Sequence, residues 1–388
     1  MTNPLKIVAD AHIWGVKSAF ASLPGFDVEL CILESSEIRH RALLDADILL
    51  TRSATRVDAA LLEGTPVRFA ATATIGDDHY DKAWLESHGI AHANAAGSST
   101  ESVVEYLAAT LLHLHTTGRI DIPSTTLGII GVGRIGSRLA EFAGSWGIRV
   151  LRNDPPRARK EGSEGFSTLD TVLEKADLIS LHTPLIRHGE DRTLHLLDGD
   201  CLARFRGNGI INAARGSCVD NHALDRWLDT DSARYAVLDC WEHEPDISRV
   251  LLAHPGCLLP TPHIAGHSLD GKAANTLYVY EALCEFLGVT TEWSPGLDGG
   301  DRIPLQIEAS GDDWQQLQAI VRQLYPILND AETMRGWLDL SAEELPRAFA
   351  TFRRHYPERR SWPAFAVRLD RPAESLRKKA AAIGIHIL

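Results

Sequence analysis

The sequence contains no apolar run of membrane-spanning length, and its first residues lack the basic and then apolar pattern of a secretory leader. Residues 1–4 lead directly into a strand-like stretch at 5–9, Leu-Lys-Ile-Val-Ala. These absences predict a cytoplasmic protein that is neither secreted nor embedded in a membrane. The contents of 44% hydrophobic and 23% charged residues are typical of a soluble globular protein.

The six cysteines form no Cys-x-x-Cys pair and lie far apart along the chain. This spacing favours free thiols in a reducing compartment over a disulfide framework or a zinc site, so no metal is expected. A surplus of positive charge is absent as well: the formal net charge is −13, which argues against nucleic acid or an anionic membrane as the main partner. The exception is the stretch 346–388, which contains ten lysines and arginines and three acidic residues.

The glycine-rich turn Gly131-Val132-Gly133-Arg134-Ile135-Gly136 is the strongest sign of a cofactor. An apolar run at 126–130 precedes it, and a segment of helical composition follows it. A strand, a tight glycine turn and a helix in this order let the backbone approach a pyrophosphate, which the helix N-terminus attracts. Asp154 lies eighteen residues after Gly136, where a dinucleotide-binding unit places the acid that holds the ribose hydroxyls. The alternative interpretation is a plain structural turn.

The chain is too long for one ordinary core, and it alternates short apolar runs with helical stretches. This alternation predicts an α/β fold with two doubly wound parallel-sheet, Rossmann-like domains and a C-terminal α+β module. We expect residues 1–100 plus 268–290 to form a substrate-binding domain, 101–267 an NAD-binding domain, and 291–388 the module, whose simplest role is dimerisation. The predicted strands lie near residue 7 and at 28–33, 48–51, 69–73, 90–93, 127–130, 149–151, 177–181, 209–212, 235–238, 257–259, 304–308 and 364–369. The longest predicted helices lie at 101–117, 268–287, 313–325, 342–355 and 373–383.

Three polar residues, Arg215, Glu244 and His263, each follow a predicted strand of the second domain. Ligands of such sheets bind beyond the carboxyl ends of the strands, so these side chains are candidates for chemistry. A histidine can take the hydroxyl proton as hydride leaves a secondary alcohol, and a carboxylate beside it stabilises the imidazolium. A guanidinium can clamp a substrate carboxylate. Together they describe the dehydrogenation of a 2-hydroxy acid, although a single histidine at a strand end is more often structural.

The loops that follow the strands of the first domain are candidates for substrate contacts by the same argument. They include Arg52 and Ser53 after one strand and Thr74 after the next. Arg52 beside Ser53 is equally consistent with a solvated strand end.

Six motifs together resemble those of the D-isomer-specific 2-hydroxyacid dehydrogenase family, over about residues 5 to 290. They are the glycine turn, Asp154-Pro155-Pro156-Arg157, His182-Thr183-Pro184-Leu185, Ile211-Asn212-Ala213-Ala214-Arg215-Gly216, Asp239-Cys240-Trp241-Glu242-His243-Glu244-Pro245 and His263-Ile264-Ala265-Gly266. The resemblance implies His263 as acid/base, Glu244 as its carboxylate partner and Arg215 as the substrate-binding arginine. It also implies substrate contacts by Ser53, Thr74 and, less directly, Arg52. The implied NAD contacts are Gly131, Gly133, Arg134, Ile135, Gly136, Asp154, Thr183, Ala213, Asp239 and Gly266.

The acid at position 154 repels a 2′-phosphate and so favours NAD over NADP, although Arg152 and Arg157 flank it. Two departures from the usual motifs bear on the substrate. His267 stands where close relatives usually have a tyrosine, and Ala96-Gly97-Ser98-Ser99-Thr100 replaces the usual Pro-Gly-x-Asn. An imidazole can still donate a hydrogen bond and, if protonated, attracts a phosphate.

The resemblance implies a phosphorylated 2-hydroxy acid as the small-molecule substrate, which carries two anionic ends. Arg215 can bind only one of them. We therefore expect Arg359 or Arg360, brought across the interface of a homodimer, to hold the phosphate; a solvated basic surface is the alternative. Two other functions stay open: a dehydrogenase of another D-2-hydroxy acid, and an NAD-sensing binding protein without turnover.

Overall fold

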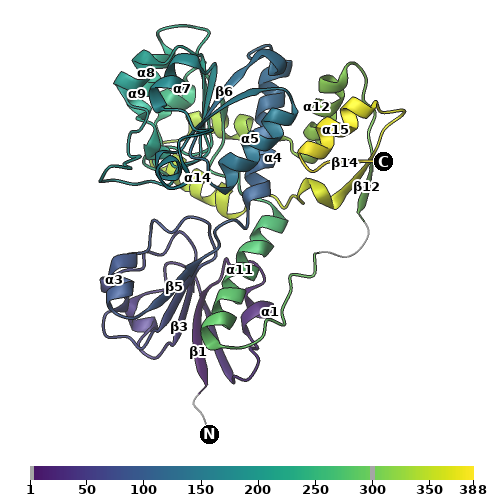
Figure 1. The fold of residues 1–388 in the computed structure, drawn as a ribbon. Helices are drawn as coiled ribbons and strands as arrows, with labels where there is room; N and C mark the ends of the chain where they lie inside the picture. Colours follow the sequence, from purple (N-terminus) through teal and green to yellow (C-terminus); the bar gives the residue numbers. More distant parts are fainter. Residues whose placement is uncertain (1–3, 298–301) are drawn as a thin grey trace. The chain divides into compact units, whose positions relative to one another are not determined.

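The computed structural model describes residues 4–297 and 302–388, and the chain divides into two compact units (Figure 1). The first comprises Met1–Ser99 with Ser268–Asp301, and the second Thr100–His267 with Arg302–Leu388. Most of the predicted C-terminal module thus belongs to the same unit as the predicted NAD-binding domain. Residues 1–3, on which the expectation about a leader partly rests, lie outside the described residues. No helix in the described ranges is long and apolar enough to cross a membrane.

The first unit is built on a five-stranded parallel sheet of order β2-β1-β3-β4-β5. The strands are β1 Leu5–Asp10, β2 Val28–Leu33, β3 Ile48–Thr51, β4 Phe69–Thr72 and β5 Ala91–Asn94. The helices are α1 Val16–Phe20, α2 Ala59–Leu62, α3 Lys82–Ser87 and α11 Leu269–Leu287. Helix α11 returns from late in the chain and packs Val279 and Leu283 into one buried cluster with Ile7 and Ile48 of the sheet.

The second unit contains a six-stranded parallel sheet of order β11-β10-β9-β8-β6-β7. Its strands are β6 Thr126–Ile130, β7 Arg149–Asn153, β8 Leu178–Leu181, β9 Gly209–Asn212, β10 Tyr235–Leu238 and β11 Cys257–Pro260. Strands β6, β8, β9 and β10 are buried along their whole length, which explains their continuous apolar runs. The chain goes from β6 to β7 on one side and then to β8 on the other, so the strand order reverses beside β6. Ligands of doubly wound sheets bind at this point, beyond the carboxyl ends of the strands.

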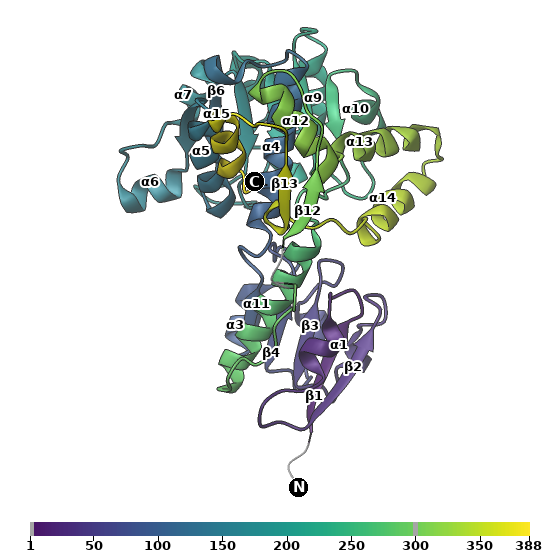
Figure 2. The ribbon, with the colours of Figure 1, turned by 90° about the vertical axis from the view of Figure 1, so that its right-hand side faces the viewer.

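Helices surround this sheet. They are α4 Thr100–Thr116, α5 Arg134–Ser145, α6 Pro155–Glu161, α7 Leu169–Lys175, α8 Gly199–Arg204, α9 Asn221–Leu228 and α10 Arg249–Ala253. Helix α4 contacts both α5 and α12 Asp313–Leu324 (Figure 2). Leu107 and Leu111 of α4 share a buried core with Leu317 and Ile320 of α12. Residues 302–388, called the C-terminal segment below, are therefore packed through α12 into the core of the second unit.

The C-terminal segment adds a small parallel sheet of order β12-β13-β14. Its strands are β12 Ile303–Gln306, β13 Phe365–Arg368 and β14 His386–Ile387, and its other helices are α13 Ile327–Gly336, α14 Glu344–Arg354 and α15 Glu374–Ala382. The sequence does not predict α13 or β14. The prediction of an α/β fold with two parallel Rossmann-like sheets is confirmed, and the third sheet is the small one described here.

Candidate active site

The turn after β6 can accept the phosphates of a dinucleotide. Gly131 has a φ of 88°, and a Cβ atom on it would lie 2.7 Å from the carbonyl carbon of His182. A Cβ on Gly136 would collide with the Gly131 oxygen, so α5 packs directly on the turn. A Cβ on Gly133 would meet no described atom within 4 Å, and no side chain of the described residues caps α5 there. The first N–H groups of α5 are thus open to a pyrophosphate, and the residues fit NAD.

Asp154 directly follows β7 and caps the N-terminus of α6, beside this turn. Its Oδ2 accepts a hydrogen bond from the Val132 N–H at 2.9 Å, and its Oδ1 accepts from the Arg157 N–H at 3.0 Å. The Arg157 guanidinium is paired with Glu161, with Nη2 and Oε2 2.7 Å apart. One of the two positive charges that flank Asp154 is therefore neutralised, which agrees with a site for the ribose of NAD.

Thr183 and Ala213 follow β8 and β9, which are neighbours in the sheet. Both residues thus lie at the carboxyl edge of the sheet, as do the glycine turn and Asp154. The adjacent His182 is half-buried, and the desolvation of its ring lowers the pKa of the imidazole to about 3. Its Nε2 lies 2.9 Å from Ser180 Oγ, so His182 is a neutral structural residue.

Arg215 is held by its own loop. Asn212 Nδ2 donates to the Arg215 carbonyl at 3.1 Å, and Arg215 Nη1 donates to the Ala214 carbonyl at 2.8 Å. A Cβ on Gly216 would collide with the Trp241 carbonyl, so the loops after β9 and β10 touch at this glycine. The contact brings Arg215 next to the loop that carries Glu244.

Glu244 and His263 form a hydrogen-bonded pair, with Oε2 and Nδ1 2.7 Å apart. The other carboxylate oxygen of Glu244 accepts from the Trp241 N–H at 2.7 Å. Burial alone would raise the pKa of Glu244, but the facing His263, Arg353 and the Trp241 N–H lower it below its usual value. The carboxylate is ionised and fixes the proton on Nδ1, which leaves Nε2 of His263 for a substrate hydroxyl.

The turn that carries His263 is organised by Asp239, whose carboxylate is buried. One oxygen accepts from Ile264 N at 2.7 Å, and the other from Ala265 N at 3.0 Å. The Asp239 carbonyl accepts from His263 N at 2.7 Å. Burial raises the pKa of Asp239, although His263 and these N–H groups oppose the rise. Asp239 therefore acts on the site through the turn, while Gly266 is half-buried at its end.

Arg52, Ser53 and Thr74 belong to the first unit. They follow β3 and β4, which are neighbours, so all three lie at one edge of that sheet. Arg52 Nη1 donates to the His12 carbonyl at 3.2 Å, and Thr74 Oγ1 lies 2.7 Å from Thr72 Oγ1. Ser53 is exposed.

The three remaining predicted residues lie in the second unit. Arg359 is buried in an ion pair with Glu105 of α4, and its guanidinium stacks 3.9 Å from the ring centre of Tyr325. Arg360 is half-buried. The ring of His267 lies edge-on to that of Tyr356, with centroids 5.8 Å apart. Arg359 is thus held by contacts within its own chain.

Known proteins match the chain over nearly its whole length. A family model described as the D-isomer specific 2-hydroxyacid dehydrogenase NAD binding domain matches residues 108–265. The chain is 40% identical over 387 residues to the erythronate-4-phosphate dehydrogenase of Azotobacter vinelandii, covering 98% of this chain and 99% of that one. It is 40% identical over 382 residues to the enzyme of the same name from Pseudomonas fluorescens, covering 97% and 98%. The chain belongs to the D-isomer-specific 2-hydroxyacid dehydrogenase family.

Solved structures of other dehydrogenases have a fold similar to that of this chain. The D-lactate dehydrogenase from Aquifex aeolicus, complexed with NAD and lactic acid, matches with a TM-score of 0.61 at 22% identity over 73% of this chain and 95% of that one. The NAD+-bound 3-phosphoglycerate dehydrogenase of Entamoeba histolytica matches with a TM-score of 0.62 at 19% identity over 75% and 98%. A second model, a domain of unknown function, matches residues 299–384. The predicted family, the fold and the use of NAD by this dehydrogenase are confirmed.

Sequence reasoning missed the residues that hold the candidate side chains Arg215 and His263 in place. Asn212 and Gly216 position the Arg215 loop, and Arg353 of α14 lies at the main chain of His263. Gly216 stands within a motif that the sequence does show. Arg353 gives no local signal, because its partner lies 90 residues away.

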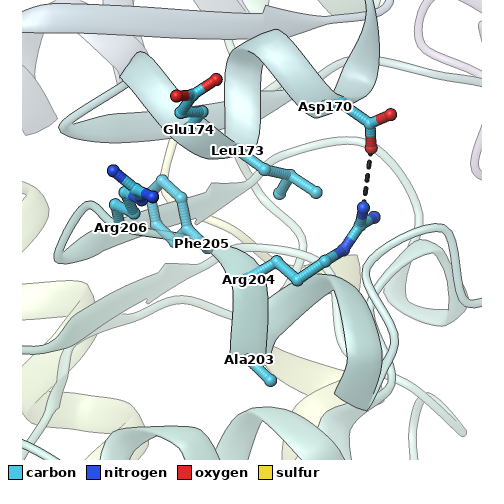
Figure 3. A pocket seen from close by; sticks show the side chains of 7 residues that line it. All are labelled: Asp170, Leu173, Glu174, Ala203, Arg204, Phe205 and Arg206. Carbon is cyan, nitrogen blue, oxygen red and sulfur yellow. Dashed lines mark hydrogen bonds and ion pairs between the residues drawn. The ribbon is translucent and has the colours of Figure 1, made fainter.

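A surface pocket of about 430 Å³ lies elsewhere in the dehydrogenase (Figure 3). Its lining comes from α7 and from the end of α8, and Arg204 Nη1 donates to Asp170 at 2.8 Å across it. Both helices lead into the amino ends of their strands, whereas the glycine turn and His263 follow carboxyl ends. The pocket is therefore separate from the site described above.

Proposed function

We propose that this dehydrogenase oxidises 4-phospho-D-erythronate to 3-hydroxy-2-oxo-4-phosphooxybutanoate with NAD, as a cytoplasmic enzyme of pyridoxal 5′-phosphate (vitamin B6) biosynthesis. The substrate is inferred from relatives named erythronate-4-phosphate dehydrogenase that are 40% identical over nearly the whole chain. The pathway is inferred from the same resemblance. The single observation that carries the chemistry is the 2.7 Å contact between Glu244 and His263.

His263 is the proposed base. Its Nδ1–H donates to the Glu244 carboxylate, so Nε2 takes the proton of the substrate's 2-hydroxyl group. The resulting imidazolium is stabilised by the ionised Glu244. Arg215 is the proposed clamp for the substrate carboxylate, because a guanidinium binds a carboxylate with two parallel hydrogen bonds.

NAD, when bound, supplies the acceptor for the hydride that leaves C2 of the substrate. The glycine turn with Arg134 and Ile135 would hold its pyrophosphate, and Asp154 its ribose hydroxyls. Thr183, Ala213 and Gly266 are proposed to line the nicotinamide half of the site. Asp239 supports it through the turn at His263.

The phosphate of the substrate needs a second cationic group. We propose Arg360 for this role, contributed across a homodimer that the C-terminal segment forms, with Ser53, Thr74 and Arg52 as further substrate contacts. His267 is proposed to donate the hydrogen bond that a tyrosine gives in close relatives. Arg360→Ala should raise KM for the phosphorylated acid by roughly 10- to 100-fold, as expected for the loss of a charge-assisted contact.

A substrate panel tests the proposal. NADH formation is measured with 4-phospho-D-erythronate, D-glycerate and D-lactate, beside a His263→Asn variant. We expect rapid turnover of the phosphorylated acid alone and a loss in the variant. Preference for another acid would favour a sister dehydrogenase, for which the change at His267 is the motivating observation. NAD binding without turnover of any acid would point to an NAD-sensing protein.

A further inference from the structure

The strand that leads to the catalytic histidine lies at the edge of its sheet. Strand β11 pairs only with β10 among the described strands, so one row of its backbone groups lacks a strand partner. Arg335 of α13 reaches this strand, where its Nη2 donates to the carbonyls of Cys257 at 2.9 Å and Leu258 at 2.7 Å. An arginine from the C-terminal segment thus satisfies backbone acceptors at the start of β11.

The same segment contacts the far end of the stretch 257–267. Arg353 Nε of α14 donates to the carbonyl of His263 at 3.2 Å. Two residues after α14 ends, Tyr356 packs its ring against the edge of the His267 ring. The C-terminal segment therefore touches 257–267 at its beginning, at its catalytic residue and at its end.

The backbone at His263 needs such support. Its φ of 56° lies in the left-handed region, where a residue with a side chain persists only when its surroundings hold it. On its N-terminal side, His263 N donates to the Asp239 carbonyl at 2.7 Å. On its C-terminal side, the carbonyl is held by Arg353. The two contacts fix the peptide groups that flank the residue and so set the direction of the imidazole.

The attachment of the segment is itself firm. Arg249 of α10 donates from Nη1 to the Leu338 carbonyl at 3.1 Å, which ties the sheet domain to the turn before α14. Met334 and Phe349 are buried in one cluster with Leu251 of α10. Arg353 is therefore presented by a helix that is packed against the domain it acts on.

We propose that residues 327–356 of the C-terminal segment position the catalytic stretch 257–267 of the same chain. Arg353 is the positioning residue, which fixes the main chain of His263. This role rests on the proposed function only in taking His263 as the base and Glu244 as its partner. The proposal assigns a role within each chain to residues 299–384, which match a domain of unknown function. This role is separate from any part in dimerisation.

Four variants test the proposal in the full-length enzyme: Arg353→Ala, Arg353→Lys, Arg354→Ala and His263→Asn. Arg354 is the matched control, because it is the exposed neighbour at the end of the same helix. Arg353→Ala should lower kcat by roughly 10- to 100-fold and leave KM for NAD within about threefold, because misplacing a catalytic group affects the reaction rather than cofactor binding. Arg353→Lys keeps the charge and should recover part of the rate, and Arg354→Ala should behave as wild type. The lysine variant decides the question if the alanine variant does not fold.

The pH profile of kcat separates positioning from a merely structural effect. Several charged or titratable groups surround Glu244. They are His263 after β11, Arg353 from α14, and Cys240 and the Trp241 N–H after β10. Arg215 and Asp239 lie close to Cys240. Arg353 lies at the main chain of His263 and faces Glu244, so removal of its positive charge makes the Glu244–His263 pair easier to protonate. The acid limb of the profile should therefore move to higher pH, and lysine should restore it. A folded Arg353→Ala enzyme with an unchanged kcat and acid limb would overturn the proposal, provided that His263→Asn is inactive. An active His263→Asn enzyme would instead overturn the proposed function.

Discussion

At the scale of single residues, we expect the rate of the dehydrogenase to depend on the Glu244 carboxylate that faces the His263 imidazole. Glu244→Gln replaces a charged acceptor with a neutral amide whose N–H₂ group can face the ring instead. We expect kcat to fall by roughly 10²- to 10⁴-fold, since the proton on Nδ1 is no longer fixed and the imidazolium loses its counter-charge. Steady-state kinetics of NADH formation measure the effect. Glu164→Gln, at an exposed position, is the control, and a Glu244→Gln enzyme of wild-type rate would remove Glu244 from this role.

For Arg359 we expect an effect on stability rather than on the rate, because it is paired with the buried Glu105. Its side chain is 10% exposed and that of Glu105 is 2% exposed, so Arg359→Ala removes a cation that is paired with a buried carboxylate. Such a loss costs about 3–5 kcal/mol of unfolding free energy. Urea unfolding followed by circular dichroism measures it. The exposed Arg354→Ala should leave this stability nearly unchanged, and equal losses in both variants would contradict the assignment.

At the scale of elements, the buried carboxylate of Asp330 links α13 to Tyr356, two residues after the end of α14. Asp330 accepts a hydrogen bond from the Tyr356 hydroxyl at 2.7 Å, and burial raises the pKa of Asp330 to about 6 from an ordinary 3.8. Because the folded pKa is the higher one, the stability that Asp330 contributes is complete below about pH 4 and is lost as the pH rises through about 6. Asp330→Asn removes this titration while it keeps an acceptor for Tyr356.

Between pH 4 and pH 8 the Asp330→Asn variant should therefore become more stable relative to wild type. Its free energy of unfolding, minus that of wild type, should increase by up to about 3 kcal/mol, from a difference of about two pKa units at 1.36 kcal/mol each. Denaturant unfolding at both pH values measures the change. The exposed Asp339→Asn is the control. A difference between Asp330→Asn and wild type that does not vary with pH would show that Asp330 does not titrate in this range.

Most elements were predictable from the sequence because the sheets are parallel and covered on both faces. Strands such as β9 and β10 are buried throughout and appear as short apolar runs between helical stretches. Helix α13 was not, since Asn329 and Asp330 interrupt its apolar pattern and its buried face is narrow. The two-residue strand β14 is too short to give a pattern at all.

The candidate site, too, was predictable only in part. Arg215, Glu244 and His263 were found because each follows a strand, and parallel topology brings such positions to one edge. Contacts between distant parts of the chain left no local trace. Arg353 lies 90 residues from His263, and Arg359 lies 254 residues from Glu105, so the basic composition after residue 346 suggested a surface or a phosphate site.

At the scale of the whole molecule, the C-terminal segment should respond to NAD although it holds none of the proposed NAD contacts. Residues 302–388 belong to one compact unit with 100–267, and α12 shares its core with α4. A ligand that binds the folded unit stabilises it by RT ln(1 + [L]/Kd), about 2.7 kcal/mol at a hundredfold excess over Kd. Hydrogen exchange is measured with and without NAD. Amides of α12 to α14 that exchange only when the whole unit unfolds should exchange more slowly with NAD, as should those of β6 and β9. Strands β1 and β3 of the first unit serve as the comparison within the same chain. If α12 to α14 exchanged at the same rate with and without NAD while β6 slowed, the segment would be an independent domain rather than part of the unit that carries His263.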